Sequence, residues 1–188
     1  MSAPRPAIGV SRRGVIKAAG FAVCAAGAGM WPLAARSQEA PRRIAFNHFH
    51  TGETLDVEFF RDGAFVPEAL DRIEGLLRDF RNGERHAIDS QLIVNLHDLA
   101  ATAGAPPVYG VISGYRSPQT NEALRAHSRG VAAHSLHLEG RAIDVRLAGI
   151  DCRTLATAAE AMARGGVGYY RTSDFVHLDT GGLRTWRG

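Results

Sequence analysis

The sequence predicts a single α+β domain in which a central antiparallel sheet is flanked by helices. Helical spacings of apolar residues come earlier in the chain, whereas paired strand patterns dominate its later part. The chain has 188 residues, 45% of them hydrophobic, which is enough for one domain with a substantial core. It contains no internal repeat and no low-complexity segment that would point to another architecture.

The first elements expected are a hairpin and two helices. Residues 43–60, RIAFNHFHTGETLDVEFF, alternate imperfectly around a turn at Gly52, which is typical of a β-hairpin. A helix is expected in PEALDRIEGLLRDFRNG, with Pro67 near its start and Gly83 after its end. Its apolar residues recur at helical spacing, namely Leu70, Ile73, Leu76, Leu77 and Phe80. A second helix is expected over residues 89–102.

The middle of the chain predicts a buried strand, a third helix and a second strand. PVYGVISGYRS reads as a strand that enters a turn, and SPQTNEALRAHS as a helix that begins at Pro118 with Ser117 as its cap. In EGRAIDVRL, strand alternation turns Ile143 and Val145 to one face and Asp144 to the other.

The last two elements expected are a helix and a hairpin. DCRTLATAAEAMARGG is typical of a helix that is capped by Asp151 and ended by Gly165 and Gly166. VGYYRTSDFVHLDTGG then predicts a short hairpin. The domain is therefore expected to cover residues 41–188.

Residues 1–40 have the layout of an export signal. Arg12 and Arg13 precede a short apolar run rich in glycine and alanine, and small residues follow it. The order Ser11-Arg12-Arg13-x-x-Ile16-Lys17 resembles a twin-arginine signal peptide. Glycines and a proline interrupt the run, which disfavours the alternative of a membrane-anchor helix. We expect export by the twin-arginine route to the periplasm, with no stable membrane span after signal removal.

The net charge of +3 for the whole sequence does not apply to the predicted domain. The first 40 residues hold five of the 22 basic residues and one of the 19 acidic ones, so residues 41–188 carry a net charge of −1. The domain therefore has no electrostatic footprint for nucleic acid. Without the leader only Cys152 remains, which excludes an intrachain disulfide, and we propose no catalytic cysteine.

Three residues with metal-binding side chains lie on strand or loop positions that could converge. His137 lies in the loop before the strand that carries Asp144, and His177 shares a strand face with Asp179. If the two strands are neighbours, two imidazoles and one carboxylate meet, which is the ligand set of a catalytic zinc site with one open position. Taken singly, a solvated loop histidine and a strand-edge acid remain the alternatives.

The pattern Ser135-x-His137-x-x-Gly140-x-Ala142-x-Asp144, followed by Asp174-x-x-His177, resembles the signature of the D-Ala-D-Ala carboxypeptidase and hedgehog-type zinc peptidases. Within that group, SGYRSPQTNEALR, SLHLEGRAIDVRL and GGVGYYRTSDFVHLDTG resemble the periplasmic murein endopeptidase branch. The resemblance spans about residues 113–181 and implies the fold of these peptidases.

The resemblance also implies a role for each matching residue. His137, Asp144 and His177 correspond to the ligands of Zn²⁺, which makes hydroxide available near neutral pH. Asp174 corresponds to the general base, and Arg116 to an arginine that anchors the substrate or stabilises the oxyanion.

The expected function is that of a zinc-dependent peptidoglycan hydrolase that cleaves amide bonds in murein peptide cross-links. A D,D- or L,D-carboxypeptidase acting on stem peptides is the nearest alternative, and a non-catalytic wall-binding or metal-binding domain is another. The expected partners are peptidoglycan peptides, and the chain is expected to be a monomer. Two residues stay open: His134 could reach the site or face solvent, and Asp179 could orient His177 or begin a turn.

Overall fold

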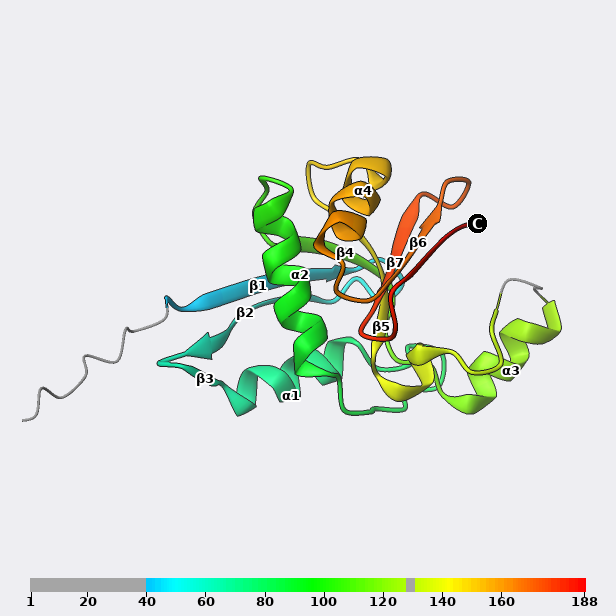
Figure 1. Ribbon diagram of the computed structural model, residues 1–188. Coiled ribbons are helices and arrows are strands. Elements are labelled where there is room, and N and C mark those ends of the chain that lie inside the picture. The colour runs from blue at the N-terminus through cyan, green and yellow to red at the C-terminus, as the bar shows by residue number, and fades with distance from the viewer. Residues whose placement is uncertain (1–39, 128–130) are drawn as a thin grey trace, which may run out of the picture. The chain divides into compact units, whose positions relative to one another are not determined.

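A computed structural model of the chain describes residues 40–127 and 131–188 (Figure 1). The predicted signal peptide lies outside the described residues, apart from residue 40. Among the described residues, no helix combines the length and the apolar character that a membrane crossing requires.

The N-terminal part of the domain holds the predicted hairpin and two helices. Strands β1 (Arg42–His48) and β2 (Thr54–Arg61) pair antiparallel, and a short edge strand, β3 (Ala64–Phe65), follows. Helix α1 spans Pro67–Leu76, and α2 spans Ser90–Thr102, with the Asp89 side chain accepting a hydrogen bond from the backbone N–H of Gln91. That cap satisfies one of the free N–H groups at the start of α2.

The prediction that α1 continues past Leu77 was wrong. The helix ends at Leu76, and the carbonyl of Leu77 accepts a hydrogen bond from the backbone N–H of Tyr115. The carboxylate of Asp79 accepts hydrogen bonds from the backbone N–H and the hydroxyl of Ser117. These long-range bonds hold the segment after Leu76 in a turn, although its apolar spacing is helical.

The rest of the domain follows the predicted order with two additions, a 3₁₀ turn and a last strand. The elements are β4 (Val108–Ser113), α3 (Pro118–His127), a single 3₁₀ turn η1 (Leu136–Glu139), β5 (Ala142–Leu147), α4 (Cys152–Met162), β6 (Gly166–Tyr170), β7 (Phe175–Asp179) and β8 (Arg184–Arg187). Helix α4 ends three residues before the predicted glycine pair, because Ala163 adopts the left-handed conformation and Gly166 already belongs to β6. The sequence patterns did not predict β8.

The described strands form one sheet in the order β3-β2-β1-β4-β5-β7-β6-β8. The α+β class is confirmed, but the sheet is mixed and not wholly antiparallel, since β1 pairs parallel with β4 and β6 pairs parallel with β8. The β1–β4 pair is parallel because the hairpin partner and two helices lie between these strands, and such a crossover returns the chain in the same direction.

The two faces of the sheet have different environments. Ile143 and Val145 of β5 and Val176 of β7 belong to the hydrophobic core, together with apolar residues of α1, α2 and α4. Helix α3 projects away from the sheet (Figure 1). Alternation along the strands puts Asp144 and His177 on the face opposite that core. The core therefore holds β5 and β7 rigidly while their polar residues meet on the other face.

Candidate metal and active site

His137 is positioned by the 3₁₀ turn that leads into β5. The Ser135 side chain accepts a hydrogen bond from the His137 N–H, and Gly140 ends the turn in the left-handed conformation at φ 64°. A side chain at Gly140 would put its Cβ 2.0 Å from the carbonyl oxygen of Ala87. Glycine is therefore required both for the backbone angle and for the close approach.

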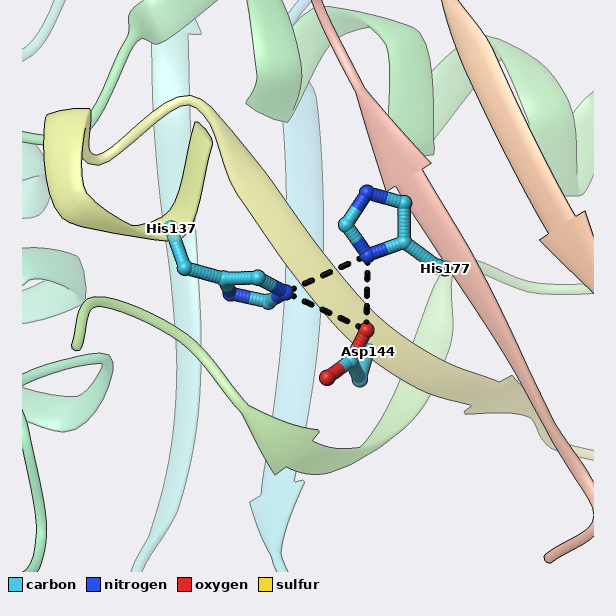
Figure 2. A group of neighbouring side chains, drawn as sticks. All are labelled: His137, Asp144 and His177. Atoms are coloured by element: carbon cyan, nitrogen blue, oxygen red, sulfur yellow. Dashed lines mark hydrogen bonds and ion pairs between the residues drawn. The ribbon is translucent and has the colours of Figure 1, made fainter. Parts of the chain in front are cut away.

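Asp144 and His177 come from neighbouring strands, as the hypothesis of convergence required. β5 pairs with β7, and Asp144 lies directly opposite His177 in the register. Cross-strand partners on one face are close enough for their side chains to touch. His137 from η1, Asp144 from β5 and His177 from β7 point toward one another (Figure 2).

The three facing atoms have the spacing of a metal ligand set. His137 Nε2 lies 3.2 Å from His177 Nδ1 and 3.3 Å from Asp144 Oδ1, and the last two atoms are 2.9 Å apart. Zinc bonded at about 2.0–2.1 Å in a tetrahedral arrangement holds its ligand atoms about 3.3 Å apart. All three residues are buried. The spacing and the donor types therefore fit a zinc ion.

Hydrogen bonds on the far side of each imidazole point a lone pair at that position. His137 Nδ1 lies 2.6 Å from the carbonyl oxygen of Gly114, and His177 Nε2 lies 3.1 Å from Asp179 Oδ2. Because a carbonyl or a carboxylate can only accept, these two nitrogens carry the protons. The nitrogens that face Asp144 are left as acceptors, which is the form that ligates metals.

The protonation states of His137 and Asp144 favour the same arrangement. Burial lowers the pKa of His137, although the neighbouring Asp144 opposes this effect. Burial alone would raise the pKa of the Asp144 carboxyl, but His137, His177 and Arg116 outweigh it and hold that pKa well below its usual value. A neutral imidazole and an ionised carboxylate are the states in which these side chains bind a metal.

Arg116 also belongs to this group. Its guanidinium contacts Asp144 Oδ2 and donates from Nε to the Ser113 hydroxyl at 2.9 Å. A register shift in β4 places Ser113 opposite Asp144 and so supports this contact. The side chain of Arg116 lines the same cavity as the three candidate ligands, with 13% of its area exposed.

The structure does not bring Asp174 to the other candidate residues. It precedes β7, with φ at 50° and a side chain that is 61% exposed. Its carboxylate lies 3.5 Å from Arg146 Nε, and its carbonyl accepts a hydrogen bond from the same guanidinium. Asp174 lines a different depression, with Phe49 and Cys152. The Arg146 contacts hold it there.

The thiol of Cys152 has no reactive character. Burial raises its pKa to about 12, and the neighbouring Asp174 carboxylate adds to the increase. A thiol in such surroundings stays protonated at neutral pH, and the thiolate is the nucleophilic form.

Several residues of the cavity were not assigned by the sequence patterns. The cavity of about 630 Å³ is also lined by His134, Tyr170, Phe175, Arg184 and Trp186. Arg184 and Trp186 come from β8, and no local sequence pattern predicts the pairing of β8 with β6. The sequence offers one signal for this wall of the cavity. Gly168 lies two residues before Tyr170 on the same strand face, and a glycine within a strand often indicates that another side chain packs on the backbone, as Trp186 does here.

Asp179, which the sequence left open, is an orienting residue for His177 in this geometry. Its side chain is fully buried, and Oδ1 accepts hydrogen bonds from the N–H groups of Gly166 and Gly181 at 3.0 and 2.8 Å. Arg184 donates to Oδ2 at 2.5 Å. With these donors fixing it, the carboxylate holds the His177 ring through Nε2.

Known proteins that resemble the chain carry the name of a peptidoglycan endopeptidase. The family described as peptidoglycan L,D-endopeptidase MepK matches residues 36–186. The peptidoglycan L,D-endopeptidase MepK of Escherichia coli K12 is 40% identical over 176 residues, which cover 94% of this chain and 97% of the relative. The probable peptidoglycan L,D-endopeptidase MepK of Haemophilus influenzae is 41% identical over 157 residues, or 83% of this chain and 84% of the relative. No solved structure matches. Identity at this level over most of both chains shows that the chain belongs to the MepK family of M15 peptidases.

Proposed function

We propose that the chain is a zinc-dependent peptidoglycan hydrolase that cleaves an amide bond in the peptide cross-links. The observation that carries the proposal is a buried His-Asp-His set that opens onto a cavity large enough for a peptide segment. Three protein ligands with one open position are typical of catalytic zinc, whereas structural zinc sites use four. The names of the relatives support an L,D-endopeptidase as the kind of activity.

In this proposal His137, Asp144 and His177 hold the metal ion. Zinc bound there would supply a Lewis acid that polarises the scissile carbonyl and lowers the pKa of a water molecule to about 7. Gly114 and Asp179 keep the two imidazoles in the tautomer that binds the ion. The buried position of the ligands excludes bulk water from this side of the cavity and strengthens their electrostatic effect.

Arg116 is proposed to stabilise the negative charge that develops on the substrate oxygen. Its guanidinium is fixed by Ser113 and Asp144, so no reorganisation is needed when the charge appears. An arginine stays charged at all relevant pH values and offers several donors, so some remain for the substrate after these two contacts.

The general-base role of Asp174 is kept as a separate proposal, because it rests on the resemblance and its carboxylate pairs with Arg146 in the structure. Asp174→Asn tests it against Asp56→Asn, an exposed strand carboxylate that is paired with Arg43. A general base contributes about 10²–10⁴-fold, so kcat is expected to fall by that factor in the Asp174 variant alone. Retention of kcat would contradict the general-base role and leave Asp174 with only a structural role in the loop before β7.

A carboxypeptidase and a non-catalytic binding domain are the alternatives to be separated by experiment. Purified cross-linked muropeptides are incubated with zinc-loaded protein, and the products are identified by mass spectrometry. Cross-linked dimers converted to monomers indicate an endopeptidase, whereas loss of a terminal residue from monomers indicates a carboxypeptidase. If dimers and monomers both stay intact, and the wild-type protein gives the same products as His137→Ala, both hydrolase hypotheses are contradicted.

The compartment follows from the substrate. Peptidoglycan lies in the cell envelope, so we propose that the domain works there after export by the twin-arginine route. Arg12→Lys together with Arg13→Lys tests the route, because a twin-arginine substrate is then expected to remain in the cytoplasm. Unchanged export of the doubly substituted protein would contradict it.

A further inference from the structure

Tyr170 shares the sheet face of the candidate ligands. In the pairing of β6 with β7, Gly168 lies opposite His177 and Tyr170 opposite Phe175. Neighbouring positions on one strand face opposite ways, so Tyr169 is on the other face, where it packs against the hydrophobic core. Tyr170 instead lines the cavity that holds His137, Asp144 and His177.

The ring of Tyr170 has little freedom to move. It stacks on Phe175 with ring centroids 4.5 Å apart and planes 13° from parallel. The backbone of Gly188 also packs against the ring, so closely that a Cβ at this glycine would lie 2.4 Å from it. A side chain held by both contacts presents its hydroxyl at a fixed position in the cavity.

Trp186 determines how that hydroxyl is used. The indole lies over the backbone of Gly168, where a Cβ would come 2.4 Å from it, and its ring centroid is 5.1 Å from that of His177. Its Nε1 donates a hydrogen bond to the Tyr170 hydroxyl at 3.0 Å. Because an indole N–H can only donate, the phenol oxygen is the acceptor in this bond.

The tyrosine hydroxyl therefore keeps its own hydrogen for another partner. Among the described residues, the Trp186 contact is the one hydrogen bond found for this oxygen. A donor held at the wall of the cavity suits an acceptor oxygen of a ligand, and a peptide carries one on each of its amide groups.

We propose that Tyr170 is a catalytic residue whose hydroxyl donates a hydrogen bond to a carbonyl oxygen of the bound peptide beside the metal position. Trp186 acts through Tyr170 as a positioning residue, since its N–H occupies the acceptor side of the phenol and directs the O–H hydrogen into the cavity. This inference rests on the proposed function and adds the substrate group that the aromatic wall of the cavity recognises.

The test compares kcat and KM for cross-linked muropeptide dimers among variants of the purified, zinc-loaded protein. Tyr170→Phe keeps the ring stacked on Phe175 and removes only the hydroxyl, so kcat/KM is expected to fall about tenfold, the usual effect of one lost neutral hydrogen bond. Zinc content and the thermal midpoint are expected to stay at their wild-type values. Tyr169→Phe, the adjacent tyrosine on the opposite face, is the matched control and is expected to retain kcat/KM.

The role of Trp186 is tested by a double-mutant cycle. Trp186→Phe is expected to lower kcat/KM in the wild-type background and to have little further effect when Tyr170 is already phenylalanine. Additive losses would overturn the positioning role. A Tyr170→Phe variant with kcat/KM within twofold of wild type would overturn the inference while leaving the proposed function intact. A wild-type protein that cleaves no muropeptide would overturn the proposed function itself, and this inference with it.

Discussion

Replacement of Asp179 by asparagine should remove a pH-dependent part of the stability of the metal-free protein. Burial alone would raise the pKa of this carboxyl, but hydrogen bonds from His177 and from the N–H groups of Gly181 and Gly166 outweigh it and lower the pKa to about 2. An unfolded chain returns the pKa to about 3.8. The difference corresponds to about 2 kcal/mol, because one pKa unit is worth about 1.4 kcal/mol.

The sign follows from the direction of the shift. A carboxyl whose folded pKa is below its unfolded pKa stabilises the folded state above about pH 4, and this stabilisation is lost as the pH falls toward 2. We expect Asp179→Asn to be about 2 kcal/mol less stable than wild type at pH 6, with the gap closing near pH 2. The side chain is fully buried, so the value needs no reduction for solvent screening.

The assay is urea unfolding of metal-free protein, followed by circular dichroism, at several pH values between 2 and 6. Asp56→Asn is the control, because its carboxylate is 65% exposed and its ion pair with Arg43 is a surface contact. A stability gap for Asp179→Asn that stays constant from pH 6 to pH 2 would refute the reasoning. It would mean that the contribution of Asp179 is steric and not electrostatic.

Three further predictions concern the backbone around the site, a buried hydrogen-bonded carboxylate and the affinity for zinc. Gly140→Ala should cost about 2–4 kcal/mol of unfolding free energy and weaken zinc binding, because strain at φ 64° adds to a backbone clash. Gly149→Ala, at φ 78° with open space, should cost about 1 kcal/mol by the same urea titration, and equal losses would contradict the clash. Asp79→Asn should cost about 1–3 kcal/mol by thermal unfolding because it disturbs two buried bonds to Ser117, and an unchanged midpoint would argue against their importance. Zinc affinity, measured by competition with a chelating dye, should fall up to about tenfold per pH unit on acidification. Burial opposes protonation of His177, but Asp144 and Asp179 raise its pKa, and an affinity that is flat between pH 8 and 5.5 would contradict this competition.

Local patterns were sufficient to predict most of the elements, whereas the convergence of the candidate ligands was predicted only on the condition that their two strands are neighbours, which the structure shows. The hairpin turn at Gly52 and the cap at Asp151 are encoded within a few residues. The spacing between His137 and Asp144 was interpretable because a loop and the strand that follows it are adjacent in the chain.

The features that sequence patterns missed depend on contacts between distant segments. The end of α1 is fixed by a hydrogen bond between Leu77 and Tyr115, and apolar spacing does not report such a bond. The orientation of Asp174 depends on Arg146, 28 residues away. β8 is short and mostly exposed, so its sequence has no alternation from which its pairing with β6 could be predicted.

Strand β8, which the sequence patterns missed, also completes the polar surroundings of the metal position. Arg184 of β8 donates to Asp179, which holds the ring of His177, and Trp186 of β8 donates to Tyr170 in the cavity wall. Arg184 and Trp186 are two positions apart in β8, so strand alternation puts them on the same face. The pairing of β8 with β6 therefore fixes one group that orients a candidate ligand and another that is proposed to contact the peptide. A metal site on β5 and β7 alone would lack both, which explains why a short edge strand without core residues can matter for the chemistry.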